Sequence, residues 1–416
     1  MKKIQKLLWL SVLCLCSSIW AHGKVGSVAK DENLNGVINF PDVKGRLTLI
    51  SDLHTHSVFS DGHVWPNIRV AEAARNGLDI LAITEHLEYQ PHIAQIPHKD
   101  RNSAFLEANE AAEGSSLIVL AGSEITRDMP PGHINAVFIK DANKLFNIDL
   151  PKNDKEKEIL NKKIREMQWG AEPAIKEHYI LGNMWPAEKA VEAANQQGAF
   201  LFWNHPDWYR QATDGIARLK PMHRKMINKG YLHGIEVVNG STYSEEAFRI
   251  AIENNLALIG TSDVHDLIEW DYDAHKNEHR PVTLIFAKRR TEKSIREALF
   301  DRRTVVVYKD KLIGRNNDLM PLLKSILNAK SDGYRKGTRI LKVEITNNSS
   351  SDMTLKNLSL VNFVDGDDFI VVPKKGNVNL NVKTLEKLKN LNLQFEVLNA
   401  LTAPKQNPVI EFEIRI

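Results

Sequence analysis

Residues 49–63 read LISDLHTHSVFSDGH and gather three histidines and two aspartates where a short apolar run ends. His54 and His56 are two residues apart, so their side chains point to the same side of an extended chain. Asp61 follows in the loop just after them. One histidine at a strand end is more often packed or hydrogen-bonded than a ligand. The meaning of this stretch therefore depends on how the other apolar runs end.

Short apolar runs alternate with amphipathic helical patterns from about Gly45 to Tyr308. The runs are RLTLISDL, LDILAIT, SLIVLAGS, INAVFI, GAFLFWN, GIEVV, LALIGT and VTLIF. Helical patterns between them, such as PNIRVAEAARNG, begin near a proline and end on a glycine, as helices prefer. This alternation predicts parallel strands joined by crossover helices. Both a barrel and a doubly wound sheet would fit.

Histidine or carboxylate side chains stand at the ends of five of these runs, and one histidine stands at the start of another. In parallel barrels and sheets the carboxyl ends of the strands form the functional face. Because unpaired buried charges are costly, such a face indicates bound cations. Imidazole and carboxylate suit divalent zinc, manganese or iron, and so many ligands imply more than one ion. The candidate ligands are His54, His56, Asp61, His86, Glu124, His133, His205, Asp263 and His265.

The order of these motifs resembles the polymerase and histidinol phosphatase (PHP) family of metal-dependent phosphoesterases. The motifs are H-x-H, a downstream Asp, T-E-H, an isolated Glu, G-H, N-H-P and S-D-V-H. The resemblance implies a distorted (β/α)7 barrel, predicted over residues 45–312, with two or three divalent metal ions. The motifs HSVFSDGHVWP and SEITRD, together with export, look most like the secreted bacterial phosphodiesterase branch.

The resemblance also implies how the ligands divide among three ions. Glu124 would bridge the first two ions. The first ion would be held by His54, His56, Glu124 and Asp263, the second by Glu124, His133 and His205, and the third by Asp61, His86 and His265. In the pair Glu85-His86 the two side chains face opposite ways on a strand, which explains why only His86 is expected to be a ligand.

The N-terminal residues 1–21 predict a signal peptide, because a basic start precedes a short apolar run and a small-residue end at Ala21. The run is shorter than the roughly 20 apolar residues that span a bilayer. A lipid anchor on Cys14 or Cys16 is less favoured, because each cysteine follows a leucine. We therefore expect an exported protein, periplasmic or associated with the cell envelope.

Removal of the signal peptide changes the charge and the available ligands. The full chain has 55 basic and 52 acidic residues. Lys2, Lys3 and Lys6 leave with the signal, so the mature chain is formally neutral. This balance makes nucleic acid an improbable partner, since proteins that follow its backbone are usually basic. Both cysteines also leave, so any metal must be held by His, Asp and Glu.

Two segments outside the barrel pattern are also predicted. A helical insertion over about 141–185 contains LPKNDKEKEILNKKIREMQWG, which favours a solvated surface helix over a lid above the site. Residues 338–416 show short alternating strands separated by Asn, Ser, Gly and Asp clusters, which predicts a small all-β sandwich.

Two residues are candidates for direct roles in catalysis. Arg127 could fork onto the free oxygens of a phosphate, with a surface ion pair to Asp128 as the alternative. His63 could protonate the departing alcohol, or could simply be a hydrogen-bonded loop residue. For Glu236 a structural or supporting role behind the ligands is favoured. Trp203, Trp208 and Tyr209 flank His205 and are expected in the core, with an apolar wall for the leaving group as the alternative.

We predict hydrolysis of a small phosphate ester by in-line attack of a metal-bound hydroxide in a trinuclear site. A phosphodiesterase is favoured over a phosphomonoesterase of the same fold. An amidohydrolase-like attack on a carbonyl is less favoured, because no lysine stands at the strand ends. The alternative from a different class is a cell-envelope binding protein with an inert barrel, which should have lost ligands.

Overall fold

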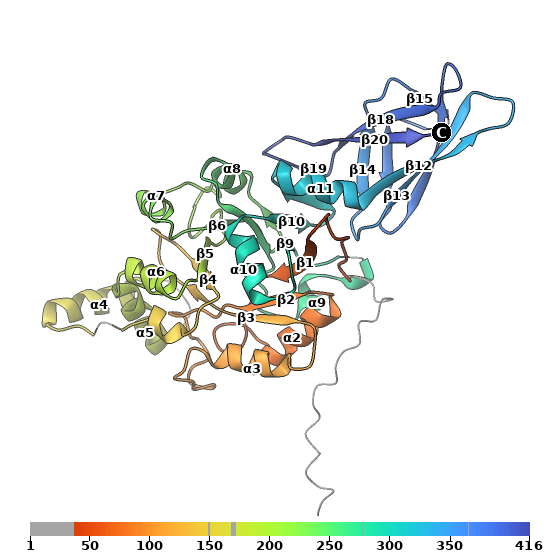
Figure 1. Cartoon of the computed structure of the whole chain (residues 1–416). Helices are drawn as coiled ribbons and strands as arrows, with labels where there is room; N and C mark the ends of the chain where they lie inside the picture. Colours follow the sequence, from red (N-terminus) through yellow and green to blue (C-terminus); the bar gives the residue numbers. More distant parts are fainter. Residues whose placement is uncertain (1–36, 149, 168–171, 277, 365) are drawn as a thin grey trace, which may run out of the picture.

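The computed structural model describes residues 37–416, except 149, 168–171, 277 and 365. The predicted signal peptide lies outside these residues. A curled sheet surrounded by helices forms one part of the molecule, and an elongated β-domain extends from one end of it (Figure 1). The predicted fold class, an α/β barrel followed by a small all-β domain, is confirmed.

The barrel sheet is built from buried, apolar strands. Its order runs β9, β1, β2, β3, β4, β5, β6 and β8. Thr283 of β9 donates to the Gly260 carbonyl of β8 over 2.8 Å and accepts from the Gly260 amide over 2.9 Å, which links the two ends of this series. The bounds are β1 (Leu47–Asp52), β2 (Ile80–Ile83), β3 (Ile118–Ile125), β4 (Ile134–Val137), β5 (Phe200–Trp203), β6 (Gly234–Asn239), β8 (Ala257–Thr261) and β9 (Val282–Ala287).

Strand β4 departs from the parallel arrangement. β1, β2 and β3 pair in parallel, as do β5, β6 and β8, but β4 is antiparallel to both β3 and β5. The start of β4 therefore lies at the same edge of the sheet as the carboxyl ends of its neighbours. This reversal explains how a histidine that precedes a strand, His133, can share a face with residues that follow strands.

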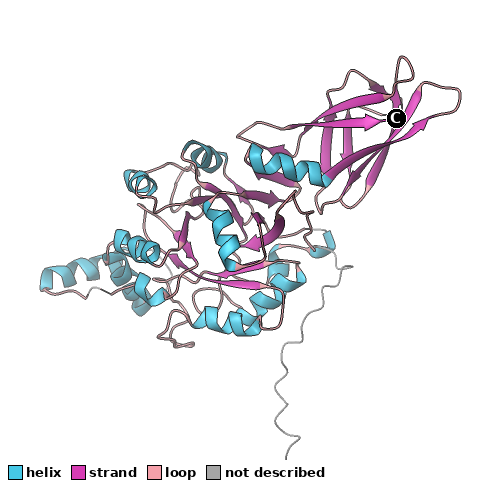
Figure 2. Cartoon of the chain, viewed as in Figure 1, coloured by secondary structure: helices cyan, strands magenta, loops and turns pink. Residues whose placement is uncertain are grey.

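Helices cover the outside of the barrel (Figure 2). Several begin at a side-chain cap: Ser244 accepts from the Ala247 amide over 3.2 Å, and Thr291 accepts from the Ser294 amide over 3.3 Å. The bounds are α2 (Pro66–Arg75), α3 (Ser103–Ala111), α6 (Ala187–Gln196), α7 (Pro221–Asn228), α8 (Glu245–Glu253), α9 (Ile268–Asp271) and α10 (Glu292–Phe300), with the short pieces β7 (Thr242–Tyr243) and η2 (Ala274–Lys276).

The predicted insertion contains η1 (Ala142–Leu145), α4 (Asp154–Glu166) and α5 (Pro173–Met184). In α4 only Leu160 is buried, and this helix projects away from the barrel in Figure 1. Helix α5 buries Tyr179, Ile180 and Leu181 in a small apolar cluster with Leu160. Thus α4 is a solvated surface helix, and α5 packs on the barrel.

The β-domain contains two four-stranded sheets. One has the order β12, β13, β17, β15 and the other β16, β14, β18, β20. Inward residues alternate with outward ones, as in β18 and β20. The bounds are β12 (Leu327–Tyr334), β13 (Ile340–Asn347), β14 (Met353–Asn357), β15 (Asn362–Phe363), β16 (Phe369–Val372), β17 (Asn377–Lys383), β18 (Asn390–Val397) and β20 (Val409–Arg415).

The junction between the two parts is tightly packed. β10 (Thr304–Tyr308) and β11 (Lys311–Gly314) extend the barrel sheet, and β19 (Ala400–Leu401) of the β-domain pairs in parallel with β11. Helix α11 (Asn316–Ile326) leads directly into β12. The predicted start at residue 338 therefore omits β12, because no glycine or proline separates the helix from this strand. No helix among the described residues is long and apolar enough to cross a bilayer.

Candidate metal centre

All nine predicted ligands lie together at one edge of the barrel. His54 and His56 follow β1, His86 follows β2, and Glu124 lies near the end of β3. His133, before the reversed β4, completes this side of the cluster. His205 follows β5, Asp263 and His265 follow β8, and Asp61 comes from the loop after β1. Side-chain atoms from these nine residues form four overlapping groups that could hold metal ions.

The first predicted ligand set converges on two carboxylate oxygens. Oε2 of Glu124 lies 3.6 Å from His54 Nε2 and 3.5 Å from His56 Nε2. Oδ1 of Asp263 lies 3.1 Å and 3.2 Å from the same two nitrogens. The two imidazoles and the two carboxylates therefore face one common point.

The second and third sets converge in the same way. Oε1 of Glu124 lies 3.0 Å from His133 Nδ1 and 3.3 Å from His205 Nε2. Oδ1 of Asp61 lies 3.4 Å from His86 Nε2 and 3.2 Å from His265 Nε2. Oε2 of Glu124 also lies 2.6 Å from His86 Nδ1. The two oxygens of Glu124 thus face different histidines, as a bridging carboxylate would.

The donor atoms fit divalent cations. The Nε2 atoms of His54 and His56 are only 3.0 Å apart, and Oε2 of Glu124 and Oδ1 of Asp61 are buried against imidazole nitrogens of the ligand histidines. Ligands about 2.1 Å from a tetrahedral ion lie roughly 3.4 Å from one another, close to the separations between these donors. A shared cation would satisfy the buried oxygens and relieve the contact between the two nitrogens.

Burial and neighbouring charges shift the pKa values of the metal-free cluster in opposite directions. Burial lowers the pKa of His56 to about 3, with further lowering by His265 and His86. Burial also lowers the pKa of His265, but Asp61 outweighs it and raises the value to about 9. The carboxyl of Glu124 is buried, yet the surrounding histidines hold its pKa well below its ordinary value. The acids therefore stay ionised, as metal ligands must.

Residues behind the ligands orient them. Oε1 of Glu236 lies 2.8 Å from His54 Nδ1 and accepts from the Thr261 hydroxyl over 2.6 Å. Oε2 of Glu236 accepts from the His205 amide over 2.7 Å. When Nδ1 of His54 carries the proton, its Nε2 is left as the metal-binding atom. Glu236 is a positioning residue in this arrangement, the role favoured from the sequence.

Two of the ligands have strained backbones. His205 has φ 27° and Asp263 has φ 52°, in the left-handed region that residues other than glycine rarely adopt. Such conformations cost about 1–3 kcal/mol each and persist where surrounding contacts hold them. The bonds that Glu236 and Asn239 make to these two segments supply such contacts.

Arg127 is buried and does not pair with Asp128. Its Nε lies 2.9 Å from Glu88 Oε1, and its Nη1 donates to the carbonyls of Gly182 and Trp185, the latter over 2.8 Å. The alternative of a surface ion pair with Asp128 is wrong, because that carboxylate instead accepts from the Tyr179 hydroxyl over 3.1 Å. Nη2 of Arg127 is buried without a hydrogen-bond partner among the described residues.

His63 lies on the rim of the site. Its side chain is 61% exposed, and its Nδ1 lies 2.6 Å from Asp266 Oδ1. Its backbone amide donates to the His265 carbonyl over 2.8 Å, which ties this loop to a ligand segment. His63 is thus a hydrogen-bonded loop residue beside the cluster, and its role as a proton donor stays a prediction.

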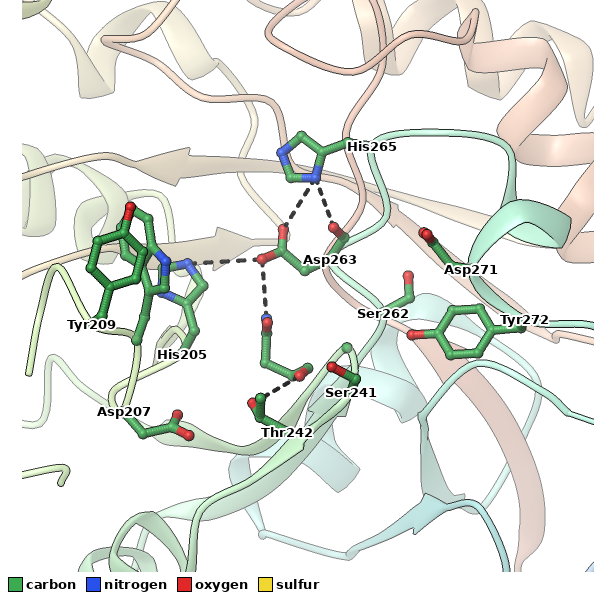
Figure 3. A pocket seen from close by; sticks show the side chains of 13 residues that line it. His205, Asp207, Tyr209, Ser241, Thr242, Ser262, Asp263, His265, Asp271 and Tyr272 are labelled. Carbon is green, nitrogen blue, oxygen red and sulfur yellow. Dashed lines mark hydrogen bonds and ion pairs between the residues drawn. The ribbon is translucent and has the colours of Figure 1, made fainter. Parts of the chain in front are cut away.

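Two cavities adjoin the cluster on different sides. The smaller, of about 530 Å³, includes His205, Asp263 and His265 in its wall. Figure 3 shows Asp263 between the two histidines there. The larger, of about 940 Å³, includes Asp61, His86 and His133. Trp208 contributes to both, and Tyr209 lines the smaller one. Trp203 is fully buried in the core, as expected for it.

Comparisons with known proteins agree with this geometry. The sequence profile of the PHP domain matches residues 52–265, and that of an Ig-like domain matches 327–413. The solved structure of a two-domain protein from Bacteroides vulgatus, which contains a predicted PHP-like metal-dependent phosphoesterase, has a TM-score of 0.77 and 34% identity. The match covers 93% of this chain and 100% of that one. This chain belongs to the PHP family.

More distant solved structures match parts of this chain. An amidohydrolase from Chromobacterium violaceum, with bound sulfate and no metal, is 19% identical over 52% of this chain and 87% of its own, with a TM-score of 0.32. A lesion-specific endonuclease from Pyrococcus furiosus is 15% identical over 65% and 60%, with a TM-score of 0.35. Scores this low carry no functional argument. Among curated proteins there is no significant match.

Several supporting residues were not predicted. Asn204 donates to Glu124 Oε1 over 2.8 Å, Gln211 Nε2 lies 2.8 Å from His205 Nδ1, and Thr126 Oγ1 lies 2.7 Å from His86 Nδ1. Asn204 directly precedes His205 and Thr126 follows Glu124 by two residues, so proximity to a ligand was the available signal. For Gln211 the sequence offers none.

Proposed function

We propose that this PHP-family protein is an exported phosphodiesterase that uses two or three divalent ions, manganese, zinc or iron. The observation that carries the proposal is the pair of cavities on different sides of the ligand cluster. A phosphodiester has two organic groups on one phosphorus atom, so its hydrolysis requires space on both sides of that atom. A monoester requires space on one side only. The signal-peptide pattern of residues 1–21 supports export.

Different residues of the site would have different roles in the hydrolysis. The nine His, Asp and Glu side chains would hold the ions, with Glu124 between two of them. Bound ions supply an activated water and neutralise charge on the phosphate oxygens. Glu236 holds His54 in position through the 2.8 Å contact. Ile175 and Tyr179 of α5 and Trp208 line the larger cavity. With no cysteine in the mature sequence, no thiolate nucleophile is available.

Arg127 would contribute positive charge to the larger cavity. Its Nη2 atom has no hydrogen-bond partner among the described residues, while Glu88 and the carbonyls at the end of α5 fix the rest of the guanidinium. A phosphate oxygen that approached Nη2 would gain a charge-assisted hydrogen bond. His63, on the rim, would protonate the departing alcohol. A small phosphate ester fits these cavities better than a nucleic acid does, because the mature chain is formally neutral.

The test compares two esters on the mature protein. Protein that begins at His22 is loaded with manganese, zinc or iron, and release of p-nitrophenol is followed from bis(p-nitrophenyl) phosphate and from p-nitrophenyl phosphate. We expect faster turnover of the diester, abolition by His54→Ala, and no effect of His275→Ala, a matched change at an exposed histidine.

Other outcomes would replace the proposal. Preference for the monoester would make the protein a phosphomonoesterase. No metal-dependent turnover of either ester, with all nine ligands intact, would return the cell-envelope binding protein to first place.

A further inference from the structure

The smaller cavity differs in charge from the larger one. The charged side chains of its wall are all acidic apart from the ligand histidines: Asp207, Asp263 and Asp271. No lysine or arginine of the described residues lines it. The larger cavity has two arginines in its wall, Arg127 and Arg210, beside the acids Asp61, Asp128 and Glu172. A second negative charge on the substrate would therefore be repelled from the smaller cavity.

The wall of the smaller cavity also presents polar groups that lack a side-chain partner among the described residues. The carboxylates of Asp207 and Asp271 and the hydroxyls of Ser241 and Tyr272 line it, and these four side chains make no hydrogen bond with another side chain in the described part of the chain. Figure 3 places Asp207 on one side and Asp271 with Tyr272 on the other. Acceptors and hydroxyls that surround a cavity suit a ligand whose groups both donate and accept.

The loop that follows β5 separates the two cavities. Asp207 and Tyr209 line the smaller one, Arg210 and Gln211 line the larger one, and Trp208 lies between them. Gln211 ties this loop to the cluster through its 2.8 Å contact with His205. The loop therefore places a carboxylate, Asp207, in the smaller cavity and a guanidinium, Arg210, in the larger one.

We propose that the smaller cavity binds an uncharged, hydroxyl-rich substituent of the phosphodiester, a short polyol or a sugar. The inference rests on the proposed phosphodiesterase function and names one half of its substrate. The volume of about 530 Å³ is ample for such a group. An ammonium group fits less well, because the two carboxylates lie on opposite walls and two hydroxyls share the site with them.

The test uses four p-nitrophenyl phosphodiesters that differ in the second substituent: 2,3-dihydroxypropyl, propyl, carboxyethyl and aminopropyl. The nitrophenyl ring fits the aromatic side chains of the larger cavity, Tyr89, Tyr179 and Trp208, which leaves the second substituent to the smaller one. We expect kcat/KM for the dihydroxypropyl ester to exceed that for the propyl ester about tenfold. The carboxyethyl ester should be the poorest substrate.

Substitutions in the smaller cavity test whether its hydroxyls cause the preference for the dihydroxypropyl ester. Tyr272→Phe and Ser241→Ala each remove one hydroxyl, and each should lower kcat/KM for the dihydroxypropyl ester roughly three- to tenfold while changing the propyl ester less than about twofold. Tyr243→Phe removes a phenol hydroxyl outside both cavities and should change neither. Calorimetric titration with glycerol phosphate and with propyl phosphate gives a binding readout independent of turnover.

The outcomes separate this inference from the proposed function. Equal rates for the dihydroxypropyl and propyl esters, or variants that affect both alike, would overturn the inference while the phosphodiesterase stands. A preference for the aminopropyl ester would assign the cavity to an ammonium group instead. If no diester is hydrolysed but glycerol phosphate binds more tightly than propyl phosphate and depends on Tyr272, the cavity assignment stands and the phosphodiesterase proposal fails. If no diester is hydrolysed and glycerol phosphate binds no more tightly than propyl phosphate, both the cavity assignment and the phosphodiesterase proposal fail.

Discussion

The barrel edge and the β-domain bury polar residues in different ways. In the β-domain the buried polar side chains are all neutral among the described residues: Asn347, Ser349, Ser350, Ser351 and Thr384. The barrel edge buries histidines and carboxylates against one another. Burial of charge is costly unless it is compensated. The difference therefore favours cation binding at the barrel edge over the described part of the β-domain.

The largest effect should follow a change at the residue shared by two ligand sets. Glu124→Gln keeps the shape of the side chain but removes the negative charge that faces five histidines. We expect kcat/KM to fall on the order of 10³-fold, beyond the 10–100-fold typical of residues behind the ligands, and metal content to fall with it. Elemental analysis and turnover of the diester measure both.

Glu113→Gln, at an exposed position, is the matched control and should change neither quantity. Retention of activity within about tenfold in Glu124→Gln would contradict a bridging role for this carboxylate.

A core substitution in the β-domain should lower stability and leave metal binding and activity unchanged. Leu393 is fully buried in β18, so Leu393→Ala should lower the free energy of unfolding by about 2–5 kcal/mol. Metal content and kcat/KM of the folded protein should stay unchanged. Denaturant titration beside elemental analysis checks both. A loss of bound metal in folded Leu393→Ala would break the division of roles between the two regions.

A smaller effect is expected at a positioning residue of the barrel. Glu236→Gln leaves the carbonyl oxygen but removes the charge next to His54 Nδ1. We expect metal affinity to fall about 10–100-fold, with less loss of kcat at saturating metal. Titration with a metal-buffered series measures the affinity, and Glu253→Gln on the exposed end of α8 is the control. Equal metal affinity in Glu236→Gln and the unaltered protein would contradict a positioning role for Glu236.

The smallest effect concerns pH. Asp61 raises the pKa of His265 to about 9 in the metal-free protein. Protonated His265 therefore stabilises the metal-free fold below pH 6.5, and this contribution is lost as pH rises through about 9. Metal binding needs the neutral imidazole, so metal affinity should rise over the same range. Thermal unfolding with chelator should show Tm falling between pH 7 and 9. A rise in that Tm would contradict the assigned pairing.

Much of the site could be predicted because its ligands stand at the ends of apolar runs. His54, His86 and Asp263 follow buried strands, and the topology brings such ends to one edge. Even His133, which precedes a strand, was included, although the reversal of β4 that places it there is a feature of the three-dimensional pairing.

Other features depend on contacts between distant segments. Arg127 pairs with Glu88 and α5, and no local pattern specifies that choice over Asp128. The left-handed backbones of His205 and Asp263 are imposed by surrounding hydrogen bonds, since neither residue is a glycine. The start of the β-domain at β12 was missed because α11 passes into the strand without a turn residue. Each of these features is set by contacts between segments that are distant in the sequence.

Diffraction data at a manganese-sensitive wavelength, from crystals grown with manganese, would show whether the barrel edge binds metal ions. We predict anomalous peaks within coordination distance of Glu124, between the His54 and His56 pair and Asp263 and between His133 and His205, with a third peak beside Asp61 at full loading. Bound manganese elsewhere on the protein, with no peak beside Glu124, would contradict the assignment of the barrel edge as a metal centre.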